Sequence, residues 1–519
     1  TSRAAIEAGI RAALGAPVTL DRRRGRLWQL PVCYGDQLAA GGTDLGDLAA
    51  ACGLTPAEVV RLHASLTCEV YMLGFLPGFP FMGDLPAVLS RPRRSEPRLR
   101  VPAGSVATAG TLTAIYPYES PGGWHLILRE PRWLASDRCL PAAPVFGGVA
   151  AGGVVAARRP GALARHRSRR VSPTGGRDGG ATGVTMATAG VSARRGRRRM
   201  SAMLEIVSAG AMASIQDLGR PGLRRLGVPR AGALQPDWLR LANALLGNDE
   251  DAPAIEFFAG GLSVRALESP LRLALAGPFA AVVVAAGSRR RLESWRSVTL
   301  APGEVLRCGM PVAGRVGYVA LAGIRVARQF GSASTYALAG LGGLDGKLLA
   351  PGARIPATAC RGGGERCLRP PPAGDGSPIR VLLGPQDDYF DAPSIAAFLS
   401  APYRVSPAAD RMGMRLQGAL LRHRPERGVE ITSDATVPGS IQVPAQGQPM
   451  VLLADGQTAG GYPKIATVIS ADLPRLAVMA PGEAVRFAAV SVAAAETAAW
   501  AREAALRALI DDIGPCTEF

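Results

Sequence analysis

Lysine and paired cysteines are scarce in this sequence of 519 residues. Lys347 and Lys464 are the only lysines among 59 Lys and Arg residues, so each is a candidate for a role that needs a compact, flexible ammonium. The eight cysteines form no CxxC pair and have no metal-type spacing with the four histidines. The sequence therefore predicts neither a zinc site nor a disulfide framework, and we expect no metal-ligand cluster.

Long apolar runs are also absent. No stretch of 18 uncharged apolar residues occurs, and the first fifteen residues contain no apolar signal-peptide core. We expect a soluble, cytoplasmic protein without membrane contact.

Glycine and proline are abundant, whereas aromatic residues make up only 5% of the chain. The 64 Gly and 42 Pro residues interrupt helices and mark turns between short strands. The sequence therefore predicts a mainly β fold with minor α (α+β). Helices are expected at residues 3–14, twice within 43–65, and at 493–510. Thr55 is the predicted N-cap of one of them, with Glu58 as its capping-box partner.

The net charge of +18 is concentrated in one segment. Residues 151–200 contain twelve arginines and a single acid, Asp178. Arginine tracts without interleaved aromatics are typical of solvated tails, so we predict no nucleic-acid partner. Because residues 131–202 lack hydrophobic periodicity, we predict a disordered linker there. It separates a domain at 1–130 from a domain at 203–502, which a helix end and tail at 503–519 follow.

Three motifs give the first half a family resemblance. LGFLPGFPFMGDLP at 73–86, RPRRSEPRLRVPAGSVATAG at 91–110 and IYPYESPGGWHLI at 115–127 resemble the B subunit of bacterial 5-oxoprolinase, which is also described as the KipI type or allophanate hydrolase subunit 1. The resemblance implies one cyclophilin-like β-barrel domain in this half.

The second half resembles the C subunit of the same enzyme, the KipA or allophanate hydrolase subunit 2 type, which is related to the carboxyltransferase part of urea amidolyase. IQDLGRPGLRRLGVPRAGAL at 215–234, DRMGMRLQG at 410–418 and GQPMVLLADGQTAGGYPKIATV at 447–468 carry the match. The resemblance implies a pair of cyclophilin-like barrels here. It also implies ATP and Mg²⁺ as cofactors, a small amide substrate, an oligomer, and a separate partner protein that resembles the A subunit of 5-oxoprolinase.

The sequence departs from the family pattern at three places. Gln235 stands where the family usually has an aspartate, and Gly456 stands where it usually has an arginine. Residues 132–199 contain no PGDxVRF-like segment, with which the B subunit normally ends. We therefore expect the first domain to lack its closing strand, and we hypothesise an altered reading frame near Pro131.

The candidate site of the second half centres on Lys464. Lys464, Arg411 and Asp410 are predicted catalytic residues, because an ammonium and a planar guanidinium suit a phosphate or carboxylate. An Asp–Arg pair that only fixes a turn is the alternative reading of residues 410–411. Hydrogen bonds, close backbone approach and a phenol make the following residues predicted substrate-binding groups: Gln457, Thr458, Gly460, Gly461 and Tyr462.

The candidate site of the first half is built from loops. Gly78 and Phe79 suit a pocket rim, although Phe79 also suits a buried aromatic turn. ESPGGW suggests an anion-binding nest or a plain hairpin turn, and His63 suits either acid–base chemistry or a packed helix face. The remaining predicted substrate-binding residues are Ser120, Gly122, Gly123 and Trp124.

The expected function is the fused B and C component of an ATP-dependent 5-oxoprolinase, which activates 5-oxoproline for hydrolysis to L-glutamate as part of a complex with the A subunit. One alternative is a biotin-dependent carboxyltransferase that acts on urea or a similar amide. A second, non-enzymatic alternative is the inhibition of a sensor histidine kinase, which the KipI name implies.

Overall fold

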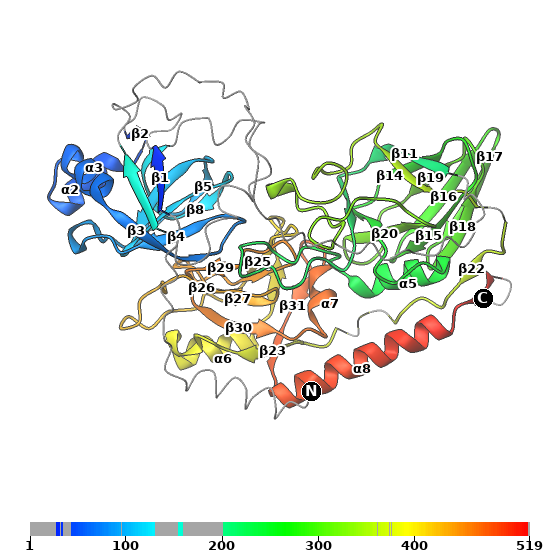
Figure 1. Cartoon of the computed structure of the whole chain (residues 1–519). Helices are drawn as coiled ribbons and strands as arrows, with labels where there is room; N and C mark the ends of the chain where they lie inside the picture. The colour runs from blue at the N-terminus through cyan, green and yellow to red at the C-terminus, as the bar shows by residue number, and fades with distance from the viewer. Residues whose placement is uncertain are drawn as a thin grey trace, which may run out of the picture. The chain divides into compact units, whose positions relative to one another are not determined.

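The computed structural model describes residues 27–31, 33–34, 43–94, 96–129, 154–158, 201–360, 362–372, 374 and 376–516. Short strands dominate and helices are few, so the predicted mainly β fold is confirmed (Figure 1). The described residues form two compact units. Unit 1 holds those up to 73 and from 78 to 158, and unit 2 holds 74–77 and 201–516. The helix predicted at 3–14 lies outside the described residues.

Unit 1 is built on an eight-stranded sheet in the order β1-β10-β3-β4-β7-β6-β9-β2, with a two-stranded ribbon of β5 and β8. Its strands are β1 (Leu27–Pro31), β2 (Cys33–Tyr34), β3 (Thr67–Leu73), β4 (Pro80–Gly83), β5 (Arg98–Val101), β6 (Ser105–Ala109), β7 (Leu112–Ile115), β8 (Ser120–Gly122), β9 (His125–Arg129) and β10 (Val154–Arg158).

The two helices predicted between residues 43 and 65 are confirmed as α2 (Leu45–Cys52) and α3 (Pro56–Ser65); a short turn, η2 (Ala87–Leu89), follows β4. Helix α3 begins at the predicted capping box: the Thr55 side chain accepts a hydrogen bond from the Glu58 amide, and the Glu58 carboxylate accepts one from the Thr55 amide. The apolar faces of these helices pack on the unit 1 core.

Strand β10 lies inside the segment that we predicted to be a linker. It pairs in parallel with β1 and antiparallel with β3. In unit 2 the last strand of an eight-stranded sheet, β32 (Phe487–Ala489), likewise pairs in parallel with an earlier strand, β23 (Ile379–Leu383). Residues 154–158 therefore occupy the sheet position of the closing strand that we expected to be missing, and the linker prediction is wrong for them. Residues 131–153 and 159–200 lie outside the described residues, and the altered reading frame stays a hypothesis.

Unit 2 contains two β subdomains, as predicted for the second half. The first (residues 201–368) has a six-stranded sheet, β17-β16-β19-β14-β11-β21, and a seven-stranded sheet, β12-β13-β20-β15-β18-β22-β33. The strands are β11 (Ser201–Ala209), β12 (Met212–Gln216), β13 (Ala254–Phe258), β14 (Leu262–Ala266), β15 (Leu271–Ala276), β16 (Ala280–Ala285), β17 (Ser288–Glu293), β18 (Arg296–Leu300), β19 (Val305–Cys308), β20 (Val316–Leu321), β21 (Arg354–Thr358), β22 (Arg366–Cys367) and, from the chain end, β33 (Gly514–Pro515).

The second subdomain (residues 376–491) has an eight-stranded sheet, β31-β24-β25-β28-β27-β30-β23-β32, and a ribbon of β26 and β29. Its strands besides β23 and β32 are β24 (Tyr403–Val405), β25 (Gly413–Gln417), β26 (Asp434–Ala435), β27 (Ser440–Gln442), β28 (Met450–Leu452), β29 (Ala459–Gly460), β30 (Lys464–Val468) and β31 (Ala484–Val485). The helical elements of unit 2 are α5 (Pro236–Leu246), η4 (Ala337–Ala339), η5 (Asp387–Tyr389), α6 (Ala392–Ser400), α7 (Leu473–Ala477) and α8 (Val492–Asp511).

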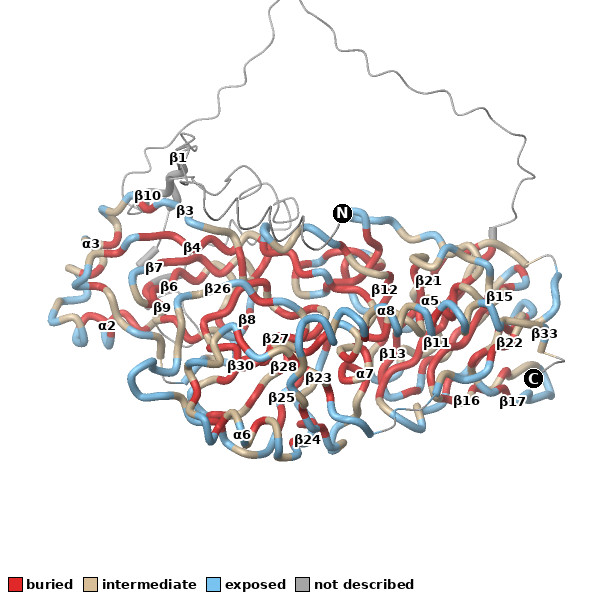
Figure 2. Tube along the Cα trace, turned by 90° about the horizontal axis from the view of Figure 1, so that it is seen from below, coloured by how far each residue is buried: buried red, intermediate tan, exposed pale blue. Residues whose placement is uncertain are grey.

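The inner strands β13 and β20 of the seven-stranded sheet are buried on both faces (Figure 2). Side chains alternate between the two faces of a strand, so Val319 and Leu321 of β20 point to the core of the first subdomain. Tyr318 and Ala320 point to the other face, where a second core continues into the eight-stranded sheet. This face also receives Glu256 of β13, which is paired directly opposite Tyr318. Polar groups on it therefore lie between the two subdomains.

The C-terminal helix predicted at 493–510 is confirmed as α8, which begins after the N-cap Ser491. Beyond α8, strand β33 pairs with β22, and Cys367 is disulfide-bonded to Cys516 with their Cα atoms 4.9 Å apart. The sequence did not predict this disulfide. Among the described residues, no helix is both long and apolar enough to span a membrane.

Candidate functional site

Lys464 begins β30, which lies between β27 and β23 in the eight-stranded sheet. Its side chain is only 2% exposed, and Nζ lies 2.8 Å from Oδ2 of Asp434, the first residue of β26. Gln386 connects the pair: its Nε2 donates to Asp434 Oδ2 at 3.3 Å, and its Oε1 accepts from the Lys464 amide at 3.2 Å. The buried ammonium is therefore held by one carboxylate that is itself half exposed.

The charge state of this pair is set by two opposing effects. Partial burial by itself raises the pKa of Asp434, but the hydrogen bond and positive charge of Lys464 outweigh burial and hold that pKa below its usual range. Lys464 has three N–H donors, of which Asp434 takes one. The ammonium thus keeps donor capacity for a further acceptor.

The predicted motif residues around Gln457 form one hydrogen-bonded group beside the ribbon β26–β29. Gln457 Nε2 donates to Gln442 Oε1 at 3.2 Å, and Gln442 Nε2 donates to the Tyr462 carbonyl at 3.4 Å. A Cβ atom at Gly460 would lie 2.4 Å from Gln442 Nε2, so a larger residue here would displace the two glutamine side chains. Gly460 also pairs with Asp434, which links the motif to the Lys464 site.

Two further predicted residues, Thr458 and Gly461, make backbone contacts in the same region. The Thr458 carbonyl accepts from the Thr436 amide at 3.1 Å, and the Gly461 carbonyl accepts from the Ile431 amide at 3.0 Å. The structure therefore brings Lys464 together with all five residues predicted from QTAGGYPK. Asp434, Gln386 and Gln442 complete the group; the sequence did not reveal them, because they come from separate loops and strands without a motif of their own.

Arg224 is a second cation at this group that we did not predict. Its Nη2 donates to the carbonyls of Thr436 at 2.5 Å and Gln457 at 3.1 Å. Arg224 lies in the LGRPGLRRLG segment that carried the family resemblance. That motif was the available signal, although nothing in it distinguishes Arg224 from the neighbouring arginines.

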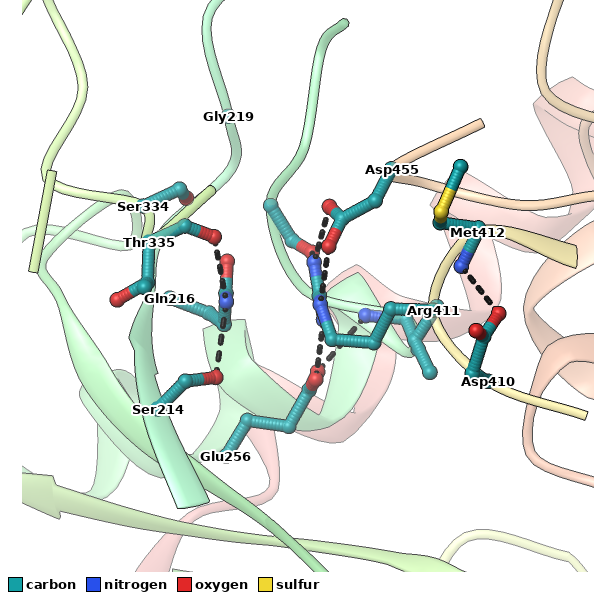
Figure 3. Close-up of polar contacts among 12 residues, drawn as sticks. Ser214, Gln216, Gly219, Glu256, Ser334, Thr335, Asp410, Arg411, Met412 and Asp455 are labelled. Carbon is teal, nitrogen blue, oxygen red and sulfur yellow. Dashed lines mark hydrogen bonds and ion pairs between the residues drawn. The ribbon is translucent and has the colours of Figure 1, made fainter. Parts of the chain in front are cut away.

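Arg411 does not join the Lys464 group; it lies in a buried network between the subdomains (Figure 3). Its Nε and Nη2 each donate to Asp455 at 2.9 Å, Nη1 donates to Glu256, and Nη2 also donates to the Gly232 carbonyl at 2.7 Å. The Tyr318 hydroxyl donates to the other oxygen of Glu256. Each guanidinium nitrogen thus has a protein acceptor, so the predicted ligand clamp is replaced by a structural cation.

The electrostatics of the network agree with a structural role. Burial alone lowers the pKa of Arg411, but Asp455 and Glu256 together raise it above its ordinary value, so the guanidinium stays charged. Asp410 has a separate role: its Oδ1 accepts from the amides of Met412 at 2.8 Å and Gly413 at 3.0 Å. Asp410 therefore fixes the turn before β25 by itself, without the pairing to Arg411 that the alternative reading assumed.

In unit 1, Phe79 and Trp124 belong to a buried aromatic cluster with Phe81 and Tyr116. Phe79 is 2% exposed and its ring lies edge-on to Tyr116 and Trp124, with centroids 5.1 and 6.0 Å apart. This is the packing alternative for Phe79 in place of an open pocket rim. Gly78 has φ of 79°, as the predicted turn requires.

The segment ESPGGW is extended and does not form a nest. Ser120 and Gly122 lie in β8, which pairs with β5, so the predicted Pro-Gly-Gly turn is wrong. A Cβ atom at Gly122 would lie 2.3 Å from the Tyr116 hydroxyl, which explains the glycine by packing. Gly123 is buried, and its carbonyl accepts from the Arg94 amide at 2.8 Å.

His63 is buried on α3, where its Nε2 lies 3.0 Å from Thr113 Oγ1. Burial lowers its pKa to about 4, so the imidazole is neutral at physiological pH. This is the packed-histidine alternative. In the described part of the chain, no group of three or more His, Cys, Asp or Glu residues could hold a metal ion.

Comparisons with known proteins agree with the two-part organisation. The family model "Carboxyltransferase domain, subdomain A and B" matches residues 226–489, and "Carboxyltransferase domain, subdomain C and D" matches residues 1–134. The chain is 39% identical to the C subunit of 5-oxoprolinase from Escherichia coli K12 over 297 residues, which are 56% of this chain and 92% of that protein.

A second relative matches the first half of the sequence, and a solved structure matches most of the fold. The chain is 54% identical to the B subunit of 5-oxoprolinase from Escherichia coli O157:H7 over 102 residues, which are 20% of this chain and 45% of that protein, so it spans less than half of that relative. The crystal structure of TTHA0988 superposes with a TM-score of 0.72 at 32% identity, covering 92% of this chain and 88% of that one.

Proposed function

Because this chain belongs to the carboxyltransferase-domain family, we propose that it is the fused B and C component of an ATP-dependent 5-oxoprolinase. In this proposal it activates 5-oxoproline for hydrolysis to L-glutamate and acts together with a separate protein of the A-subunit type. The observation that carries the proposal is that one chain resembles the B subunit in its first half and the C subunit in its second.

The chemistry explains why a charged, buried site is needed. The five-membered lactam of 5-oxoproline is a stable amide, and ATP supplies the phosphoryl group that activates its oxygen. Negative charge that develops on the transferring group is stabilised by a fixed cation in a site that excludes water. Lys464 offers such a cation, because its ammonium is buried and has donors beyond the one that Asp434 takes.

The residues of the Lys464 group include one carboxylate that suits Mg²⁺ and one ammonium that suits a phosphate oxygen. Mg²⁺ that is bound with a nucleotide often uses only one or two protein carboxylates besides phosphate oxygens. Asp434, with its half-exposed carboxylate next to Lys464, is the group that would hold the metal ion. Lys464 would hold a phosphate oxygen, and Gln457 and Thr458 would orient the amide.

The test is an assay of glutamate and ADP release from 5-oxoproline by the full chain with a partner of the A-subunit type. Lys464→Ala is expected to lower turnover at least ~100-fold, the scale of losing one such electrostatic contact. Lys347→Ala removes the other, exposed lysine and is expected to leave turnover unchanged. Wild-type turnover by the Lys464 variant would remove this lysine from the mechanism, and no ADP release by the wild-type complex would refute the proposed reaction.

A second candidate function is biotin-dependent carboxyl transfer to urea or a similar amide. The description of the matching family as a carboxyltransferase domain favours it. Carboxylation of urea by the chain in the presence of a biotin carboxylase and carboxybiotin, with no ADP-linked glutamate release, would select this function.

A further inference from the structure

Two of the four arginines in the loop between β12 and α5 are buried or partly buried and form no ion pair with a described carboxylate. Arg220 is fully buried, with 0% of its surface exposed, and Arg224 is partly exposed. In the described part of the chain neither forms an ion pair, whereas Arg411 forms ion pairs with two acids. The loop thus buries two cations that make no direct contact with a carboxylate among the described residues.

Arg220 has most of its hydrogen-bonding capacity unused. Its Nη2 donates to the Ser334 carbonyl, but Nε and Nη1 are buried and have no partner among the described residues. The nearest acid in sequence, Asp217, is engaged elsewhere: its Oδ1 accepts from the hydroxyls of Ser332 and Ser334 at 2.6 Å and from the Gly219 amide at 2.8 Å, and its Oδ2 accepts from the Ala333 amide at 2.6 Å.

Arg224 also has unused hydrogen-bonding capacity. Its Nη2 is bound to the two carbonyls described above, but Nη1 is buried and has no partner within the described ranges. Burial lowers the pKa of both arginines, and for Arg220 the charges of Asp217 and Asp455 only partly oppose that effect. A guanidinium in this environment is destabilised unless another group supplies acceptors.

Both arginines border residues 455–458, next to the Lys464 group. Arg224 donates directly to the Gln457 carbonyl. The Arg220 amide donates to the Arg230 carbonyl, and the following Ala231 amide donates to the Ala454 carbonyl at 3.0 Å. The loop that carries Arg220 is therefore fastened to the strand end that precedes residue 455.

Two buried hydroxyls with unused capacity belong to residues that directly follow backbone partners of the arginines in sequence. Thr458 Oγ1 is buried without a partner among the described residues, and Thr458 follows Gln457, which Arg224 contacts. Thr335 Oγ1 is buried in the same state, and Thr335 follows Ser334, which Arg220 contacts. Figure 3 shows Ser334 and Thr335 together with Gly219, the residue before Arg220.

We propose that Arg220 and Arg224, with the hydroxyl of Thr458, form an oxyanion-binding subsite next to the Lys464 group. Planar guanidinium groups bind carboxylate or phosphate through paired N–H donors, and a bound oxyanion supplies the acceptors and the negative charge that both arginines lack. In the proposed reaction, the group bound here is the carboxylate of 5-oxoproline, an identification that rests on the proposed function.

The test is calorimetric titration of the full chain, without ATP or a partner protein, with three probes: 5-oxoproline, 2-pyrrolidinone and inorganic phosphate. 2-Pyrrolidinone is the same lactam without the carboxylate. We expect 5-oxoproline to bind at least ~10-fold more tightly than 2-pyrrolidinone, since a charged hydrogen bond contributes about 1.5–3 kcal/mol. Arg224→Gln and, independently, Thr458→Val are expected to weaken 5-oxoproline binding by ~10-fold or more.

Arg225→Gln is the matched control, because Arg225 is the exposed neighbour of Arg224 and should bind like wild type. Equal affinity for 5-oxoproline and 2-pyrrolidinone, or unchanged affinity in both Arg224→Gln and Thr458→Val, would overturn the subsite. If phosphate binds and Arg224→Gln abolishes its binding while 5-oxoproline does not bind, the subsite stands and the proposed substrate fails. If none of the three probes binds, the subsite is wrong, while the Lys464 assay still decides the proposed reaction.

Discussion

Two buried arginines of unit 2, Arg411 and Arg220, differ in the groups that surround them. Arg411 lies between Glu256 and Asp455, and each of its nitrogens has a protein acceptor. Arg220 is equally inaccessible, yet it has one acceptor and no ion pair among the described residues. The difference shows that burial alone does not identify the function of a charged side chain. A cation whose nitrogens all have protein acceptors serves the fold, and a cation with donors left over has capacity for a ligand.

The largest expected effect comes from removing Arg411, the cation that forms ion pairs with two buried acids. Arg411→Ala leaves Glu256 and Asp455 buried without a counterion, which should lower the free energy of unfolding by about 3–5 kcal/mol. Urea denaturation followed by tryptophan fluorescence measures this loss. Arg225→Ala, at an exposed position, is the control. A loss below about 1 kcal/mol would mean that the network contributes little to stability.

The second prediction concerns His63, a buried side chain that is uncharged at neutral pH. The His63 pKa is lowered from 6.5 to about 4, so the unfolded chain takes up a proton below pH 6.5 while the folded chain does so only near pH 4. Stability from this residue is therefore complete above pH 6.5 and is lost as the pH falls toward 4, by an amount on the order of 3 kcal/mol. Comparing wild type with His63→Gln across this range should show a flatter pH dependence in the variant, and parallel curves would contradict the assignment.

A third prediction concerns Arg220, the buried cation that forms no ion pair among the described residues. Arg220→Met replaces a buried guanidinium by an apolar chain of similar length, so stability should change by less than about 1 kcal/mol or increase, in contrast to Arg411→Met. Thermal unfolding of both variants in the same buffer measures the contrast. Equal destabilisation of the two would show that Arg220 is as well compensated in the fold as Arg411.

The smallest effect is expected at an exposed ion pair. Arg100 Nη2 lies 2.7 Å from Glu119 Oε1, but the two side chains are 77% and 50% exposed. Such pairs are screened by water and salt, so a double-mutant cycle with alanine at both positions should give a coupling below about 0.5 kcal/mol. A coupling above ~1 kcal/mol would show that accessibility does not separate weak pairs from strong ones in this protein.

Local sequence signals predicted several elements well. Thr55 and Glu58 marked the start of α3, because capping depends on residues three positions apart. The final helix was predicted within a residue or two of its ends. Strand β10 was missed, because its glycine-rich, arginine-rich surroundings resemble linker sequence and its partner β1 is more than a hundred residues away.

The candidate site was predicted only in part, for the same physical reason. The scarcity of lysine pointed to Lys464, and its own motif supplied Gln457 and Thr458. Its carboxylate partner Asp434 lies 30 positions earlier in the two-residue strand β26, so no local pattern could reveal it. Arg411 was misjudged because one of its acids, Glu256, comes from the other subdomain, 155 positions away.

The bond between Cys367 and Cys516 closes a covalent loop around the whole second subdomain. A protease that cuts the backbone once anywhere between these cysteines would leave two fragments still joined. They would migrate separately on a denaturing gel only after a thiol reductant opens the bond, so the second subdomain can tolerate a nick without losing its attachment to the rest of the chain.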